Sequence, residues 1–224
     1  MKIEEKKYIY LSHFLNEDTP SYGNRNPFKR EFDSQISCCK TANSQIWHLS
    51  NHIGTHIDFP YHFDEVGKKL QDYPPNFFIF KDIQLLNLEC EAGYIILLND
   101  LCEKLSKTTD FLIIKTGFES YRGKSVYWEN NPGIHPEVGL ELRKSFPKLK
   151  AIGFDFISLT SFKNRELGKE AHKSFLHSKF DNPPIVLVED MKLSELTEAP
   201  KSLIALPLLV DNCDGAPVTI VAEL

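Results

Sequence analysis

The chain has 224 residues, of which 42% are hydrophobic and 25% charged, and its formal net charge is −5. A prior of about 150 residues per domain and this ordinary composition predict a soluble globular protein, and they exclude a disordered chain, a collagen-like repeat and a disulfide scaffold. Consecutive basic residues form nothing longer than pairs such as Lys68-Lys69, so there is no basic stripe and we expect no nucleic-acid partner.

The sequence predicts neither a secretion signal nor a membrane span. Residues 1–15 contain no apolar stretch followed by a small-residue cleavage site, and the longest apolar run, 203–210, is interrupted by Pro207 and is too short to cross a bilayer. The five cysteines are odd in number and lack C-x-x-C spacing. We therefore expect a reduced, cytoplasmic protein.

Short runs rich in Ile, Val and Phe, bounded by turn residues, predict the strands. In chain order these strands are 45–49, 77–80, 94–98, 111–115, 151–154, 185–189, 203–206 and 218–221. Helices are expected over 99–105, over 136–146, with Pro136 at its first turn, and over 165–176. Strands dominate first and then alternate with helices, which predicts a single mixed α/β domain over residues 1–224.

The most informative segment is residues 51–63. Three of the eight histidines in the chain, His52, His56 and His62, fall within eleven residues, together with Asp58. Imidazole and carboxylate groups together suit zinc, manganese or iron better than calcium. This segment therefore predicts a metal site, and the alternative is a loop with three surface histidines.

The spacing of these residues requires a bent chain. A straight strand would separate His52 from His56 by about 13 Å, whereas a metal–nitrogen bond is about 2 Å long. A helix is disfavoured by Gly54 and by Pro60. We expect the chain to bend at Gly54, which lacks a Cβ, and to bring His52, His56 and Asp58 around one point.

The pattern His52-x-Gly54-Thr55-His56-x-Asp58-x-Pro60-x-His62 resembles the signature of the metal-dependent cyclase family, which includes bacterial-type kynurenine formamidases and isatin hydrolases. Looser matches follow the family in the same order, and the resemblance covers nearly the whole chain. It implies a swivelling β/β/α fold assembled as a homodimer or tetramer. The looser matches are Asp18-Thr19-Pro20, Thr116-Gly117-Phe118, Asn131-Pro132-Gly133, Gly153-Phe154-Asp155 and Asp214-Gly215-Ala216-Pro217.

The resemblance also implies one or two divalent ions, Zn²⁺ or alternatively Mn²⁺. His52, His56 and Asp58 would bind the first ion, and Asp58 would be shared with a second ion held by His172 and Glu189. His62 matches the proton-transfer residue of the family. Tyr22 occupies a position where formamidases carry tryptophan, and it would either stack on a substrate ring or simply pack.

The residues themselves support the distant ligands. Glu189 ends an apolar row on the strand 185–189, where a buried carboxylate needs a partner. The alternatives are a solvated strand end for Glu189 and a solvated helix face for His172, which also competes with His177.

The resemblance therefore implies a hydrolase of an amide C–N bond that uses metal-activated water. The implied small-molecule substrate is an aryl formamide, such as N-formylkynurenine in tryptophan catabolism, or a small cyclic amide. Two alternatives use the same site: a lactonase or dehydrating cyclase, and a metal-binding protein without catalysis.

Overall fold

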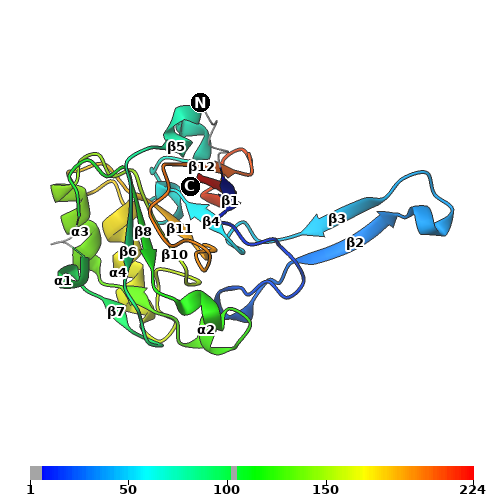
Figure 1. The fold of residues 1–224 in the computed structure, drawn as a ribbon, viewed down its shortest axis with the longest axis horizontal. Helices are drawn as coiled ribbons and strands as arrows, with labels where there is room; N and C mark the ends of the chain where they lie inside the picture. The colour runs from blue at the N-terminus through cyan, green and yellow to red at the C-terminus, as the bar shows by residue number, and fades with distance from the viewer. Residues whose placement is uncertain (1–6, 102–104) are drawn as a thin grey trace, which may run out of the picture.

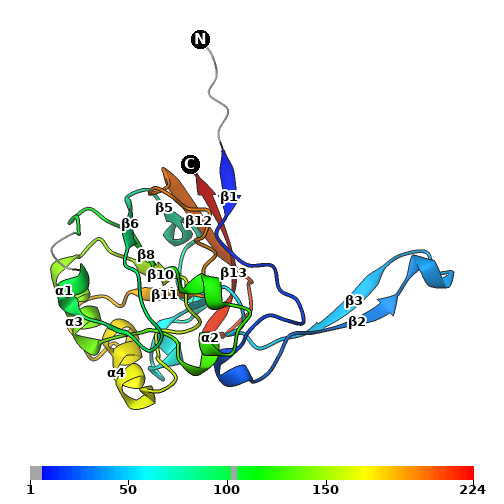
Figure 2. The same ribbon diagram turned by 60° about the horizontal axis from the view of Figure 1, so that its bottom comes forward.

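The computed structural model describes residues 7–101 and 105–224. Its centre is a nine-stranded mixed sheet with the order β5-β12-β13-β4-β11-β10-β8-β6, and β1 pairs with β13 beside this path (Figures 1 and 2). The strands are β1 (Tyr8–Tyr10), β4 (His56–Asp58), β5 (Ile79–Phe80), β6 (Ile83–Asn87), β8 (Phe111–Lys115), β10 (Ala151–Phe154), β11 (Val186–Glu189), β12 (Ser202–Pro207) and β13 (Gly215–Glu223).

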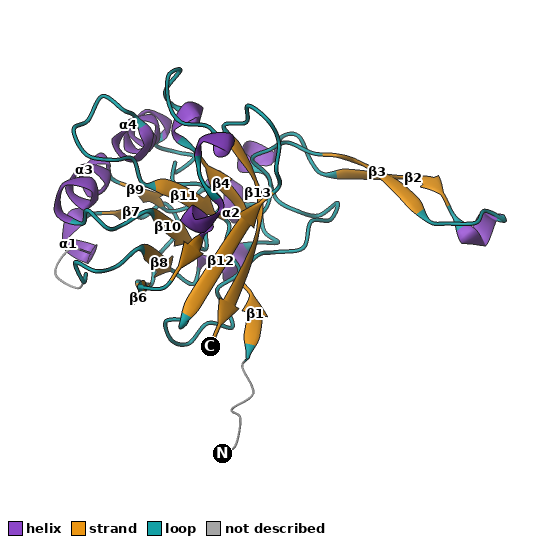
Figure 3. Ribbon diagram, turned by 90° about the horizontal axis from the view of Figure 1, so that it is seen from above, coloured by secondary structure: helices purple, strands orange, loops and turns teal. Residues whose placement is uncertain are grey.

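One half of the sheet is parallel, and its central strands are buried on both faces. Strands β6, β8, β10 and β11 run in the same direction, and all residues of β10 and β11 are buried. Such strands have continuous apolar sequences because neither face meets water. Helices α3 (Pro136–Ser145) and α4 (Arg165–Leu176) lie side by side on one face (Figure 3).

Alternate residues of these strands supply two separate cores. Leu112 and Ile152 belong to the core under α3 and α4. Phe111 and Ala151 belong to the second core, where β12 and β13 pack against the other side of the sheet. The sheet therefore curls around the second core, and its two halves meet at β4.

Strand β4 is the junction between the two halves of the sheet. It is antiparallel to β11 on one side and to β13 on the other, and Asp58 lies opposite Leu187 and Gly215. All three residues of β4 are buried. Hydrogen bonding on both sides makes this short strand a rigid platform for its side chains.

Strands β2 (Lys29–Ser34) and β3 (Ser44–His48) form a separate two-stranded ribbon. We call residues 29–48 the arm, because the ribbon extends away from the body of the molecule (Figure 1). The remaining short elements are α1 (Leu98–Leu101), α2 (Val126–Glu129) and the paired strands β7 (Ile95–Ile96) and β9 (Gly133–Ile134).

The mixed α/β prediction is confirmed, and the structure has the predicted strands 111–115 and 151–154 and the predicted helix 165–176 with the same bounds. The predicted strand 77–80 instead begins as a 3-10 turn, Pro75–Phe78, because proline fixes φ at a turn value. The predicted helix 99–105 corresponds to α1, and residues 102–104 lie outside the described part. Strands β1, β2, β4, β6 and β9 were not predicted. Among the described helices, none has the length and apolar character needed to cross a membrane.

Candidate metal centre

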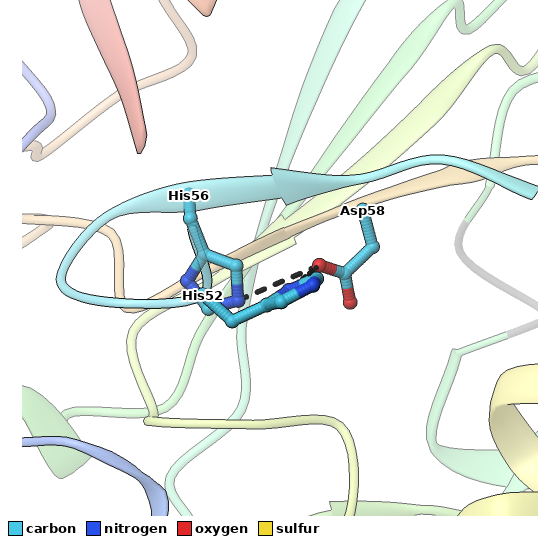
Figure 4. A group of neighbouring side chains, drawn as sticks. All are labelled: His52, His56 and Asp58. Atoms are coloured by element: carbon cyan, nitrogen blue, oxygen red, sulfur yellow. Dashed lines mark hydrogen bonds and ion pairs between the residues drawn. The ribbon is translucent and has the colours of Figure 1, made fainter. Parts of the chain in front are cut away.

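Strand β4 and the loop before it bring the predicted signature residues together. His56 and Asp58 are two positions apart and therefore point to the same side of β4, and the chain turns back at Gly54, where φ is 62°. The Nδ1 atom of His52 lies 2.9 Å from Oδ1 of Asp58, and Nε2 of His56 lies 3.5 Å from the same oxygen (Figure 4). The predicted bend at Gly54 is confirmed.

Strand β11 and helix α4 add the two distant residues. Glu189 ends β11 directly opposite His56, and its Oε2 lies 3.4 Å from Nε2 of His56. Nε2 of His172 lies 3.4 Å from Oε1 of Glu189 and 3.8 Å from Oδ2 of Asp58. His177, the competing histidine, instead lies 3.3 Å from Asp64.

Backbone acceptors fix the orientation of two imidazoles. Nδ1–H of His56 donates to the carbonyl oxygen of Gly54 at 2.8 Å, and Nδ1–H of His172 donates to that of Gly168 at 3.0 Å. Both Nε2 atoms therefore face the carboxylates, and each would offer its lone pair to a metal ion that displaced its proton. Metal-binding histidines have this arrangement, in which the second ring nitrogen donates to a protein acceptor.

Two groups of three potential ligands share one carboxylate. His52, His56 and Asp58 form one group, and Asp58, His172 and Glu189 form the other; within each group the ligand atoms lie within 4.8 Å of one another. Imidazole nitrogens and carboxylate oxygens are the ligands of Zn²⁺ and Mn²⁺. The residues present therefore fit one or two divalent ions, with Asp58 in the shared position.

The electrostatics of the cluster require positive charge. Asp58 is 1% exposed and Glu189 is 3% exposed. Burial alone would raise the pKa of Asp58, but His52 and His62 hold it below its usual range. Burial would lower the pKa of His52, yet Asp58 and Asp214 raise it to about 10. Protons on the histidines thus compensate the carboxylates, and a divalent cation would do the same.

Asp214, which the sequence analysis did not identify as a site residue, connects the cluster to His62. Nε2–H of His52 donates to its Oδ2 at 2.9 Å, and Nδ1–H of His62 donates to the same oxygen at 2.8 Å. Nδ2 of Asn51 donates to Oδ1 at 2.6 Å. The sequence held one signal for this position, the run Asp214-Gly215-Ala216-Pro217. In the structure a Cβ on Gly215 would lie 2.5 Å from Cε1 of His52.

The cluster lies at the wall of a pocket of about 320 Å³. Tyr22, Phe63 and Ile157 supply apolar walls, and His62 also faces this space. The Tyr22 ring packs edge-on against Phe162 with 5.3 Å between ring centroids. The pocket can therefore accommodate a flat, largely apolar ligand beside the metal-binding groups.

A buried ion pair between Arg122 and Asp190 holds the end of β11 in place. Asp190 directly follows Glu189, and the Arg122 guanidinium donates to both of its carboxylate oxygens, at 2.9 and 2.8 Å. The Tyr127 hydroxyl donates to Asp190 at 2.5 Å, and the Thr55 hydroxyl donates to its carbonyl oxygen at 2.6 Å. This network ties the end of β11 to the loop that begins β4.

The chain is similar to known proteins over most of its length. The sequence profile of the family described as "Putative cyclase" matches residues 9–160. The kynurenine formamidase of Bacillus anthracis is 28% identical over 220 residues, which cover 96% of this chain and 97% of that protein. The kynurenine formamidase of Bacillus mycoides (strain KBAB4) has the same identity and coverage.

Solved structures share the fold at lower sequence identity. An isatin hydrolase bound to the product analogue thioisatinate has a TM-score of 0.79 and is 16% identical, with 98% of this chain and 93% of that chain covered. A potential metal-dependent hydrolase with cyclase activity has a TM-score of 0.76 and is 19% identical, with 98% of both chains covered.

Proposed function

Because this chain belongs to the cyclase family, we propose that it is a metal-dependent hydrolase that cleaves the amide C–N bond of an aryl formamide, such as N-formylkynurenine. The observation that carries the proposal is the pair of ligand groups sharing Asp58 at the wall of an aromatic-lined pocket. The full-length similarity to kynurenine formamidases supports the choice of an amide over other carbonyl substrates.

In this proposal His52, His56 and Asp58 hold one divalent ion, and Asp58, His172 and Glu189 hold a second. When bound, such ions lower the pKa of a water molecule and polarise a carbonyl group. The protein's contribution is orientation: the carbonyl oxygens of Gly54 and Gly168 hold the His56 and His172 rings with Nε2 toward Glu189, where each nitrogen would bind an ion.

His62 is the proposed proton-transfer residue. Its Nδ1–H donates to Asp214, which leaves Nε2 as the ring nitrogen available for proton transfer. Nε2 can accept a proton from the attacking water and return it to the amine nitrogen as the C–N bond breaks. The ring lies 4.1 Å from the His52 ring, centroid to centroid, which places the proton acceptor beside the metal-binding group.

The pocket walls set the proposed substrate class. Tyr22 and Phe63 offer ring faces or edges to an aromatic amide, and Ile157 closes the apolar surface. Aromatic pairs of this kind contribute about 1 kcal/mol beyond the burial of area. We assign Tyr22 to substrate binding on this basis.

Several finer properties are part of the same proposal. We propose that residues 1–224 form one catalytic domain that uses Zn²⁺, with Mn²⁺ as the alternative, and that it acts in tryptophan catabolism. The described cysteines Cys38, Cys39, Cys90 and Cys213 are all free, which supports a reducing compartment and hence the cytoplasm. We also propose a homo-oligomer, a dimer or a tetramer.

The test is turnover of amide and ester substrates by protein loaded with zinc or manganese, together with chelated protein as the control. We expect hydrolysis of N-formylkynurenine and of formanilide, little hydrolysis of an aryl ester or lactone, and loss of turnover on chelation. Preferential turnover of the lactone would contradict the amide assignment. Metal content measured by mass spectrometry should be one or two ions per chain, and no bound ion would contradict the metal site.

The role of His62 has its own test. Replacement His62→Ala should leave the metal content nearly intact and lower turnover by about 10²–10⁴-fold. His177→Ala is the matched control, because His177 pairs with Asp64 outside the cluster. Loss of metal from His62→Ala would make His62 a ligand and overturn its assigned role.

A further inference from the structure

One wall of the pocket beside the metal centre carries two cationic side chains from α4. Arg165 and Lys169 both line the pocket, and with His172 they occupy positions four and three residues apart, which places all three on one face of the helix. At about 1.5 Å per residue, Lys169 lies about 5 Å and Arg165 about 10 Å from His172 along the helix axis. His172 is buried whereas Arg165 and Lys169 are exposed, so this face runs from the metal centre to the mouth of the pocket.

The two cations determine the charge of the pocket wall away from the metal centre. Apart from the metal-binding cluster and His62, the described residues that line the pocket include no other charged side chain. Asp58 and Glu189 lie against histidines of the cluster. The chain as a whole has a net charge of −5 and repels anions. The mouth of the pocket is therefore a local exception that attracts a negatively charged group.

Arg165 is held beside the aromatic wall of the pocket. Its guanidinium lies over the Phe162 ring, 4.0 Å from the ring centroid, and the same ring packs against Tyr22. Burial raises the pKa of the Tyr22 hydroxyl, and the nearby charge of Arg165 opposes that rise. Stacking uses the face of the guanidinium, so its N–H groups, which lie in the plane, can still donate to a carboxylate.

Lys169 can change partners at small cost. Its Nζ lies 2.6 Å from Oε1 of Glu166, and the two side chains are 54% and 86% exposed. An ion pair this exposed contributes little to stability, because solvent screens it. A carboxylate at the mouth of the pocket could therefore displace Glu166 from the ammonium group.

We propose that Arg165 and Lys169 bind a carboxylate of the substrate and thereby make the enzyme selective for aryl formamides that carry one, a class to which N-formylkynurenine belongs and formanilide does not. The formamide lies at the metal centre, the ring along Tyr22, and the carboxylate at the mouth. Arginine offers paired N–H donors that fit two carboxylate oxygens, and lysine adds a mobile point charge. This inference rests on the proposed function and names the residues that determine its specificity.

The experiment compares two substrates that differ only in this charge: the analogue of N-formylkynurenine without its amino group, which is an acid, and the methyl ester of that acid. Release of the aryl amine by zinc-loaded enzyme gives kcat/KM for each. Arg165→Met and Lys169→Met should each lower kcat/KM for the acid by about tenfold, mainly through KM, because each removes a hydrogen bond to a charged group. The value for the ester should change by less than about twofold, since the ester has no charge to lose.

Lys173→Met is the matched control. It removes the same charge from α4, but Lys173 pairs with Glu170 and does not line the pocket. Lys169→Arg should keep most of the preference for the acid, because it keeps the charge. In the wild type that preference should shrink as the salt concentration rises from about 0.05 to 0.5 M, since salt screens exposed charges. Circular dichroism should show every variant folded.

Binding separates this inference from the proposed function. The deformylated acid and its ester can be titrated into each protein by calorimetry, which requires no turnover. Binding of the acid alone weakened by about tenfold in Lys169→Met would support the cationic mouth, and would do so even if no formamide were hydrolysed, a result that would overturn only the proposed function. Equal losses for acid and ester in Lys169→Met, or a wild type without preference for the acid, would overturn the inference.

Discussion

Asp214 is the residue whose removal most directly tests how the site is organised. Its Oδ2 accepts hydrogen bonds from both His52 and His62, so a single substitution, Asp214→Ala, removes an orienting acceptor from a proposed ligand and from the proposed proton-transfer residue. The variant should remain folded, because the Asp214 side chain belongs to neither hydrophobic core.

The bond from His52 to Asp214 sets the expected loss of metal affinity, and the bond from His62 to Asp214 sets the expected loss of turnover. A hydrogen bond to a charged group contributes about 1.5–3 kcal/mol, and losing an acceptor behind a metal-binding histidine lowers metal affinity by about 10–100-fold. Loss of the bond to His62 frees that ring to rotate, so turnover at saturating metal should fall by a further factor of about 10². Asp214→Asn keeps a neutral acceptor and should show smaller losses of both kinds.

The assay measures two quantities for each protein: metal affinity by competition with a chelating dye, and kcat at saturating metal. The double variant Asp214→Ala/His62→Ala distinguishes the two effects. Its kcat should match that of His62→Ala alone, because Asp214 acts on turnover through His62, while its metal affinity should match that of Asp214→Ala. Metal affinity within threefold of wild type in Asp214→Ala would refute the reasoning.

Four further outcomes are expected. Asp58→Asn should lose metal and activity together, since Asp58 belongs to both ligand groups; an active, fully loaded variant would contradict its shared position. Gly215→Ala should lower metal affinity at least tenfold, because the new Cβ would lie 2.5 Å from Cε1 of His52, whereas Gly123→Ala, with open space around it, is the neutral control. Metal uptake should release protons and strengthen as pH rises toward about 10, because burial lowers the pKa of His52 but Asp58 and Asp214 raise it to about 10, and a histidine must lose a proton to bind metal; calorimetry in buffers of different ionisation enthalpy measures this release, and its absence would contradict the protonated cluster. Arg122→Met should cost about 3 kcal/mol of unfolding free energy by leaving Asp190 buried and unpaired; urea unfolding measures the loss, and an unchanged midpoint would argue against a structural role for the pair.

The parts of the fold that the sequence predicts are those with strong local patterns. Strands β8 and β10 are uninterrupted apolar runs, and α4 combines good helix formers with one apolar face. Strands β2 and β4 escape prediction for different reasons. The β2 sequence is mostly charged and its strand exists through pairing with β3, whereas β4 has three residues and is a strand because β11 and β13 bond to both of its sides.

The site shows the same division. The signature residues His52, His56 and Asp58 follow from composition and from the bend at Gly54, because they are close in the chain. His172 and Glu189 were identified through the resemblance to the family, because 114 positions separate Asp58 from His172 and no local pattern links them. Asp214 has a role that depends on which strand lies beside β4, and that is a property of topology rather than of local sequence.

Substitutions of the metal-binding residues and substitutions of the pocket-wall residues should differ in their cost to stability. Four of the five groups that would hold metal lie on β4, β11 and α4 and are buried, so their replacement disturbs the core of the molecule, whereas the fifth, His52, is half-buried in the loop before β4. Tyr22 and Phe63 lie outside the regular strands and helices, where substitutions cost little stability. One scaffold can therefore retain its metal chemistry while its substrate preference diverges. Kynurenine formamidases and isatin hydrolases, which resemble this chain over nearly its whole length, are named for different substrates.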